Sequence, residues 1–117
     1  MKAVATHITE QLVQDACNEA AMAARTAAKQ TYQALGGDKG ACGFAWVNVW
    51  GVRSNSKLGN ALKAAGFRKD YKPKCLSMWN PGELPVQNID IKEAGADAMA
   101  TYLRSLGLNA YSGSRLD

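Results

Sequence analysis

The segment 43–50, with the sequence GFAWVNVW, constrains the fold more than any other part of the chain. Its side chains alternate between the two sides of an extended backbone. One side carries Phe44, Trp46, Asn48 and Trp50, and the other carries Ala45, Val47 and Val49. This period-two pattern of aromatic and β-branched residues predicts a β-strand. Because both sides are mostly apolar, we expect a central strand whose sheet has a layer of structure on each face.

The segment from about Ile8 to Leu35 is rich in alanine, the best helix former, and predicts one long helix. Thr6 is a candidate N-cap, and the pair Gly36-Gly37 is a candidate C-terminal stop. The inward stripe at helical spacing consists of Ile8, Leu12, Cys17, Ala20, Ala24, Ala27, Thr31 and Leu35. Because these side chains are mostly small, the helix can lie close to a sheet or to another helix.

Shorter elements follow the strand at 43–50. Ser54 or Ser56 can cap a helix over 57–65. Two short strands, over 67–71 and 74–79, are separated by a turn that contains proline. A second helix begins at Asp90-Ile91-Lys92-Glu93, which has the form of a capping box. A final strand is expected over 108–111.

This order of elements is the order of the ferredoxin-like split βαβ arrangement. We therefore expect the α/β (α+β) class and a single domain, 1–117, with a mixed four-stranded sheet. Residues 1–36 would hold the N-terminal helix, 42–111 the split βαβ core and 112–117 a polar tail. Right-handed crossovers place two helices on one sheet face. We expect the N-terminal helix to cover the other face.

Several stretches resemble a known group of proteins: CGFAWV at 42–47, WNP at 79–81, DIKEAGA at 90–96, NAY at 109–111 and SRLD at 114–117. On these stretches the chain is similar to a group of small uncharacterised proteins of tailed bacteriophages. The likeness runs from about Cys42 to the end of the sequence. It implies a phage origin and expression inside a bacterium, and it implies no activity and no catalytic residue.

Composition excludes several classes of protein. The apolar fraction of 47% and the charged fraction of 21% are typical of a soluble globular protein. No run approaches the roughly 20 apolar residues of a membrane helix, and the N-terminus lacks an apolar signal-peptide core. We therefore expect a cytoplasmic protein without a membrane partner. Cys17, Cys42 and Cys75 have no close spacing, which argues against a disulfide framework and a zinc site.

The candidate catalytic groups do not form a coherent set. His7, the one histidine, is either an exposed residue near the start of the first helix or a general base. Cys42 and Cys75 are interpreted as structural thiols rather than nucleophiles, since no histidine follows to activate them. Asp90, Glu93 and Asp97 share one helix face and can hold a hard cation, but acidic groups also favour a helix N-terminus. We predict no catalytic residue, no metal and no cofactor.

Positive charge is concentrated between Arg53 and Lys74, where seven basic residues and one acidic residue give a net charge of +6. The candidate cations for nucleic-acid or other anion binding are Arg53, Lys57, Arg68, Lys69, Lys72 and Lys74. Phe67, Tyr71 and Trp79 are interleaved with them and could stack on bases. A lysine-rich hairpin is also an ordinary way to protect an edge strand, in which case the aromatic rings belong to the core.

The aromatic side of 43–50 also bears on whether the rings bind a ligand or belong to the core. If the N-terminal helix covers Phe44, Trp46 and Trp50, these rings are core; otherwise they form a stacking surface or an oligomer interface.

A second candidate site surrounds the helix that begins near Asp90. Backbone N–H groups of Lys92 and Glu93 are expected to be unpaired there and to attract a small anion. The residues that we assign to this site are Trp79, Asn80, Gln87, Lys92 and Arg115. Asn80 can instead serve only to shape a turn.

We therefore expect a small phage-type accessory protein that acts by binding rather than by catalysis. The leading ligand class is nucleic acid or nucleotide. The alternatives are an inhibitor that binds a bacterial host enzyme or defence system, and a virion or homo-oligomeric structural component.

Overall fold

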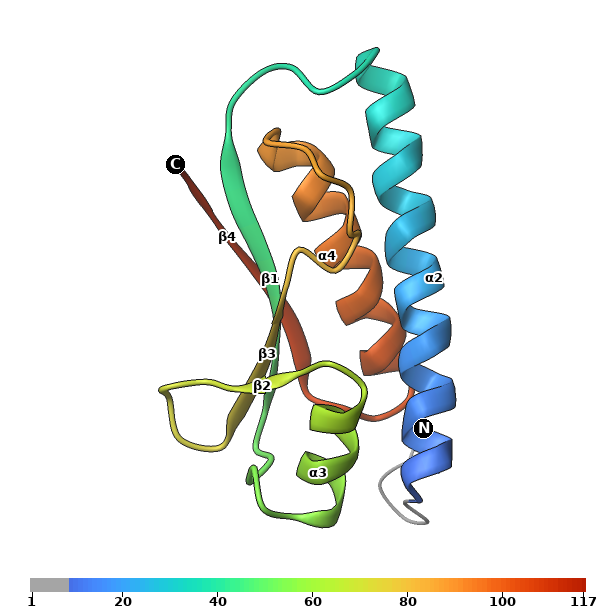
Figure 1. Ribbon diagram of the computed structural model, residues 1–117, viewed down its shortest axis with the longest axis vertical. Helices are drawn as coiled ribbons and strands as arrows, with labels where there is room; N and C mark the ends of the chain where they lie inside the picture. The colour runs from blue at the N-terminus through green and yellow to red at the C-terminus, as the bar shows by residue number, and fades with distance from the viewer. Residues whose placement is uncertain (1–8) are drawn as a thin grey trace.

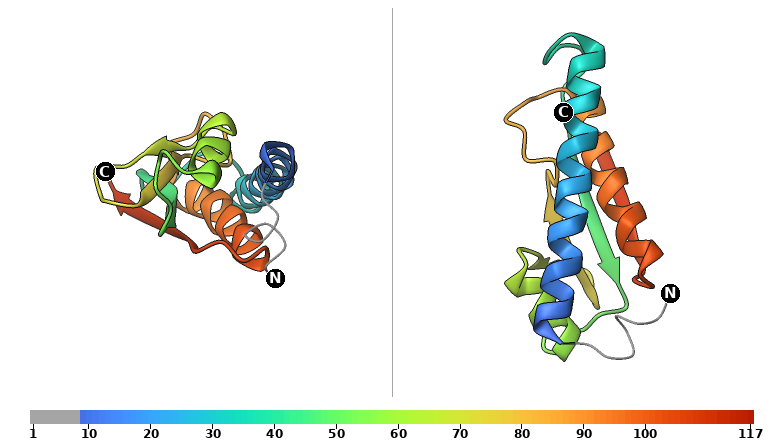
Figure 2. Two further views of the ribbon diagram at one scale, coloured as in Figure 1. Left: turned by 90° about the horizontal axis from the view of Figure 1, so that it is seen from below. Right: turned by 90° about the vertical axis from the view of Figure 1, so that its right-hand side faces the viewer.

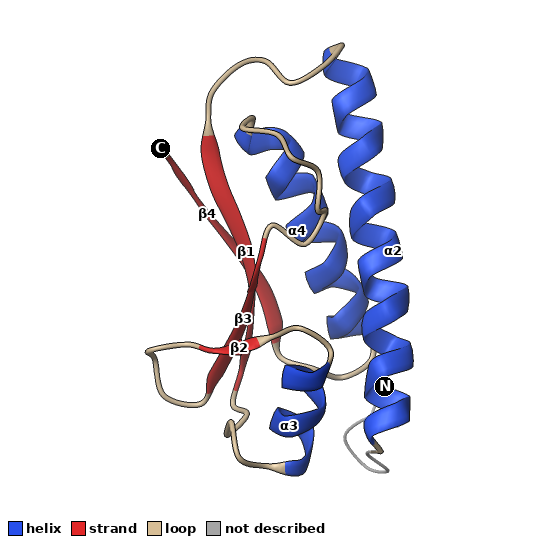
Figure 3. Cartoon of the chain, in the orientation of Figure 1, coloured by secondary structure: helices blue, strands red, loops and turns tan. Residues whose placement is uncertain are grey.

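The computed structural model describes residues 9–117. The elements, in chain order, are α2 (Glu10–Leu35), β1 (Gly43–Trp50), α3 (Lys57–Ala64), β2 (Arg68–Lys69), β3 (Cys75–Trp79), α4 (Ile89–Ser105) and β4 (Ala110–Leu116) (Figures 1 and 3). They form a single mixed domain of helices and one four-stranded sheet, as the sequence predicts. None of the helices within residues 9–117 has the length and apolar character that a membrane crossing requires.

The strand order in the sheet is β2-β3-β1-β4, and every neighbouring pair is antiparallel. The prediction of a mixed sheet is therefore wrong. The physical reason lies in the connections: the crossovers through α3 and through α4 each skip one strand, so the strands that run parallel are separated by an antiparallel neighbour. β1 is a central strand, as its alternating pattern predicts.

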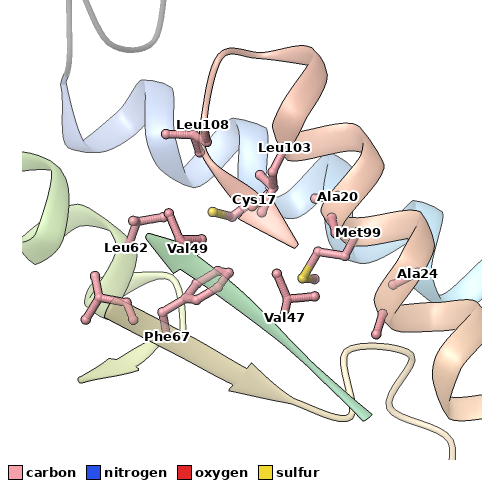
Figure 4. Close-up of a cluster of buried hydrophobic side chains, with 14 of the residues drawn as sticks. Cys17, Ala20, Ala24, Val47, Val49, Leu62, Phe67, Met99, Leu103 and Leu108 are labelled. Atoms are coloured by element: carbon pink, nitrogen blue, oxygen red, sulfur yellow. The ribbon is translucent and has the colours of Figure 1, made fainter. Parts of the chain in front are cut away.

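The three helices lie on the same side of the sheet (Figures 1 and 2). α3 and α4 cover the sheet, and α2 packs on α3 and α4 as a third layer. The prediction that the N-terminal helix covers the opposite face is therefore wrong. One core joins all three layers: Cys17 and Ala20 of α2 belong to the same buried cluster as Val47 and Met99 (Figure 4).

Small residues explain why α2 can pack closely on the other helices. Its buried stripe is Val13, Ala16, Cys17, Ala20, Ala24 and Ala28, whereas the predicted core residue Leu12 is 36% exposed. A Cβ added to Gly82 would lie 2.7 Å from the Cβ of Ala28, and one added to Gly95 would lie 2.9 Å from the backbone of Gly82. The alanine stripe therefore allows α2 to approach α4 and the 80–88 loop closely.

The cap of α4 differs from the prediction. Asn88 is the N-cap, with its side chain accepting the Ile91 N–H at 2.9 Å, and Asp90 lies in the first turn. Asn88 is itself held by the Asp38 carboxylate, which accepts its backbone N–H at 2.9 Å. The capping-box prediction is wrong because this contact comes from a distant part of the sequence. The N-cap of α3 is Ser56, one of the two residues predicted for it. The N-cap of α2 is Thr9. The predicted cap Thr6 lies outside the described residues.

The segment 112–117 is not a free polar tail, because β4 extends to Leu116 and pairs with β1 along its length. Its polar residues have partners on α4: the Ser114 hydroxyl donates to Glu93 and the Ser112 hydroxyl donates to Asp97. These contacts allow a polar strand to lie against a helix.

The strand predicted over 67–71 is shorter than expected, since β2 contains only Arg68 and Lys69.

Candidate nucleic-acid-binding face

The sheet has one face, on the left of Figure 1, that none of the helices within residues 9–117 covers. Along β1, Ala45, Val47 and Val49 are buried against the helices, whereas the aromatic side is only half-buried. Antiparallel pairing brings side chains of the neighbouring strands to the same side. We call this surface the open face and define it by the strand residues Phe44, Trp46, Asn48, Trp50, Arg68, Ser77, Trp79, Tyr111, Gly113 and Arg115, together with Asp70, which lines the same cavity.

Two tryptophans form the centre of the open face. Trp46 on β1 lies opposite Trp79 on β3, and their ring centroids are 4.9 Å apart with planes inclined by 32°. Phe44 meets Trp79 edge-on at 6.1 Å. Trp46 lies against the β4 backbone at Gly113, where an added Cβ would be 2.6 Å from its Nε1. Trp79 remains 54% exposed, so a flat apolar ring is presented to solvent.

Cations lie beside the aromatic rings of the open face. The Lys72 ammonium is 5.4 Å from the Trp50 ring and 5.2 Å from the Tyr71 ring. The Arg115 guanidinium is 5.4 Å from the Phe44 ring. Such contacts contribute about 0.5–1 kcal/mol each at exposed sites. They hold positive charge next to flat rings, which is the combination that single-stranded nucleic acids bind.

A cavity of about 270 Å³ opens on this face. Its aromatic and cationic lining comes from Trp46, Tyr71, Trp79, Lys72 and Arg115. Its polar lining comes from Asn48, Ser77 and Asp70. Asn48 and Ser77 are direct neighbours in the register, and the Asp70 carboxylate accepts the Lys72 N–H at 3.3 Å. The cavity can therefore offer both stacking surfaces and hydrogen-bonding groups to one ligand.

The predicted cations do not form one patch. Arg68 and Lys72 belong to the open face or its cavity, but Lys69 pairs with Leu76 and faces the opposite side of the sheet. Arg53 and Lys74 line a separate cavity of about 290 Å³ near the start of α3, where Lys57 is the first helical residue. Among the predicted aromatics, Tyr71 is 88% exposed. Phe67 is buried in the core, so its interpretation as a stacking ring is wrong.

The predicted small-ligand site is divided by the structure. Trp79 and Arg115 lie at the open face, whereas Gln87 and Lys92 line a different cavity of about 230 Å³. The Asn80 side chain donates to the Leu84 carbonyl at 3.1 Å and so shapes a loop.

The anion site expected at the start of α4 already has partners within the chain. The Lys92 ammonium donates to the Gly43 carbonyl at 2.8 Å. The backbone N–H of Lys92, which the sequence predicts to be unpaired, donates to the Asn88 carbonyl. The Asp38 carboxylate accepts the N–H groups of Gln87 and Asn88 just before the helix.

The candidate catalytic residues that the structure describes are Cys17, Cys42 and Cys75. His7 lies outside the described residues. Cys17 and Cys75 are buried and Cys42 is exposed, all three as free thiols. Burial raises the pKa of Cys17 to about 11, and burial together with the Asp70 charge raises the pKa of Cys75, which makes both thiols poor nucleophiles. No group of three or more His, Cys, Asp or Glu side chains in residues 9–117 is placed to hold a metal ion.

The contribution of β4 to the open face differs from the prediction of a polar tail over 112–117. The period-two spacing of Tyr111, Gly113 and Arg115 was the available signal. Asp70, the one acidic residue between Arg53 and Lys74, has no sequence signal for its place in the cavity. No protein-family model, curated protein or solved structure matches this chain.

Proposed function

We propose that this protein binds single-stranded nucleic acid on the open face. The observation that carries the proposal is the exposed Trp79 ring, which packs against Trp46 and shares a cavity with Lys72 and Arg115. Bases stack on flat aromatic rings irrespective of sequence, and phosphates are attracted to lysine and arginine. The phosphates of a duplex could contact the cations, but its bases could not stack on the rings because they are already stacked on one another.

The arrangement of strands supports the same proposal. The order β-α-β-β-α-β with strand order β2-β3-β1-β4 fits a ferredoxin-like domain. In RNA-recognition modules, a four-stranded sheet presents aromatic residues on which bases stack. Here Trp46 and Trp79 occupy the two central strands. The proposal includes a phage origin and action in the host cytoplasm, both of which rest on the sequence resemblance.

Fluorescence anisotropy tests this function. Single-stranded and duplex probes of equal length are titrated over a salt series, and the single-stranded probe is expected to bind more tightly. All three tryptophans of the chain lie on the open face, so bound bases should also quench the intrinsic fluorescence.

A pair of variants gives the control. Trp79→Ala should weaken binding by about tenfold or more, since base stacking is worth roughly 1–3 kcal/mol. Tyr32→Ala removes an exposed ring from α2 and should leave binding unchanged. Absence of binding at low salt, or equal losses in the two variants, would reject the proposal.

A second candidate is docking of a protein, either a bacterial host enzyme or a second copy of the chain. The half-buried rings of Phe44 and Trp46 and the exposed ring of Trp79 favour it, because apolar residues grouped on a surface also mark protein interfaces. A pull-down from nuclease-treated lysate and light scattering of the purified protein distinguish this candidate from nucleic-acid binding. Loss of the captured material after nuclease treatment would favour nucleic acid.

A further inference from the structure

The polar groups of the open face lie in one row across the sheet. The register places Arg68 opposite Ser77, Ser77 opposite Asn48, and Asn48 opposite Tyr111. The next row toward one end of the sheet contains Trp79 and Trp46. The next row toward the other end contains Cys75 and Trp50, and the Asp70 N–H bonds to the Cys75 carbonyl at 3.0 Å. Hydrogen-bonding groups are therefore enclosed between aromatic rings.

Asp70 is the one carboxylate in the lining of this cavity, whose other charged members are Lys72 and Arg115. A carboxylate on a surface that binds phosphates opposes that binding, since like charges repel. One of its oxygens accepts the Lys72 N–H, which fixes the position of the group. A carboxylate has about four acceptor positions on its two oxygens, so acceptor capacity remains for a ligand.

The chemistry of the bases determines which of them this lining fits. A carboxylate is best matched by two adjacent N–H donors, which it binds in a bidentate manner. Guanine presents such a pair, N1–H and the 2-amino group, on its Watson–Crick edge. Adenine and cytosine place an acceptor nitrogen next to their single amino group, and uracil and thymine place carbonyl oxygens on each side of one N–H. Each of these acceptors would face the negative charge of Asp70.

We propose that the cavity selects a guanine base of the bound strand. The base stacks on Trp79, and its N1–H and 2-amino groups donate to the Asp70 carboxylate. Its O6 accepts a hydrogen bond from the Asn48 amide or the Lys72 ammonium, both of which line the same cavity. This inference rests on the proposed function and names the base that the site recognises.

The test uses thymidine oligonucleotides that carry one central guanine, hypoxanthine or adenine. Hypoxanthine keeps N1–H and O6 but lacks the 2-amino group, so it removes one of the two donors to Asp70. We expect the affinity to fall in the order guanine, hypoxanthine, adenine. The difference between guanine and adenine should be about tenfold or more, as for a bidentate base contact.

The matched variants are Asp70→Asn and Asp15→Asn. Asparagine keeps an oxygen that can accept the Lys72 N–H, so Asp70→Asn should preserve the turn while removing the charge that selects guanine. The guanine and adenine probes should therefore bind this variant with equal affinity. Asp15 is an exposed residue of α2, and its variant should keep the full preference. Circular dichroism verifies that both variants are folded.

The outcomes separate the two proposals. If all probes bind the native protein with equal affinity, the guanine inference is rejected and nucleic-acid binding stands. If no probe binds at low salt, both proposals are rejected. A preference for guanine that persists in Asp70→Asn would show that another group reads the base.

Discussion

The Trp46 and Trp79 rings lie on the two central strands with centroids 4.9 Å apart and planes inclined by 32°. The Trp46 ring lies against the β4 backbone at Gly113, and Trp79 is the more exposed member of the pair. The two rings therefore have different roles. Trp46 supports the surface, and Trp79 is the ring of the pair that a ligand can contact more fully.

Trp79→Ala should reduce binding without unfolding the protein. Because Trp79 is 54% exposed, we expect a loss of no more than about 1 kcal/mol in the free energy of unfolding. Leu76→Ala, on the same strand but fully buried, should cost about 2–5 kcal/mol. Urea titration measures both values. Similar losses in the two variants would mean that Trp79 is part of the core.

Gly113→Val should displace the Trp46 ring. A Cβ at this position would lie 2.6 Å from the Trp46 Nε1 and 2.7 Å from its Cε2, so the indole must move. We expect a shift in tryptophan fluorescence, weaker nucleic-acid binding and a loss of about 1–3 kcal/mol from overpacking. Ser112→Val, on the opposite side of the same strand, is a suitable comparison. An unchanged emission spectrum in Gly113→Val would contradict this contact.

The sequence determines side-chain direction in this sheet more clearly than it determines layering. The alternation over 43–50 correctly separates Val47 and Val49 from Trp46 and Trp50. It cannot show which helix covers which side, because an alanine stripe such as that of α2 fits a sheet and a helix equally well. Only the close contacts at Gly82 and Gly95, which are distant in sequence from α2, decide between these arrangements.

Contacts with distant parts of the sequence also explain two wrong predictions in the C-terminal half, the cap of α4 and the polar tail over 112–117. Asn88 and Asp90 both match a cap pattern, and the Asp38 carboxylate selects the former. The polar segment 112–116 belongs to a strand that pairs with β1, and Glu93 and Asp97 accept its serine hydroxyls. Neither pairing has a signature in a short sequence window. The aromatic and cationic residues of the open face were partly identified, but their separation from Phe67, Arg53 and Lys57 required the fold.

Ala24→Leu tests the packing of α2. Ala24 is fully buried, and its carbonyl lies near the positions where a Cβ would stand at Gly82 and Gly95. A leucine has no space there, so we expect a loss of about 1–3 kcal/mol in the free energy of unfolding. Ala34→Leu, at an exposed position of the same helix, should change stability by less than about 0.5 kcal/mol. Equal effects would show that α2 is packed through a different face.

Cys17 should make the protein less stable in alkaline solution. Burial raises the pKa of its thiol from 9.0 to about 11, so the fold favours the neutral form. The unfolded chain ionises first as pH rises, and stability is therefore lost between about pH 9 and 11 and fully retained below that range. Thermal melts across this range should show a smaller alkaline decrease for Cys17→Ala than for the native protein. Parallel decreases would assign the effect to other groups.

The salt dependence of binding should identify the cations that contact phosphates. Each contact with a single strand contributes a slope of about −0.7 in the plot of log affinity against log salt concentration. Arg68→Ala and Lys72→Ala should each reduce the slope by about this amount, because both residues lie at the open face. Lys29→Ala removes an exposed cation from α2 and should leave the slope unchanged. If Lys29→Ala reduces the slope while Lys72→Ala does not, the strand follows the helical side of the molecule instead.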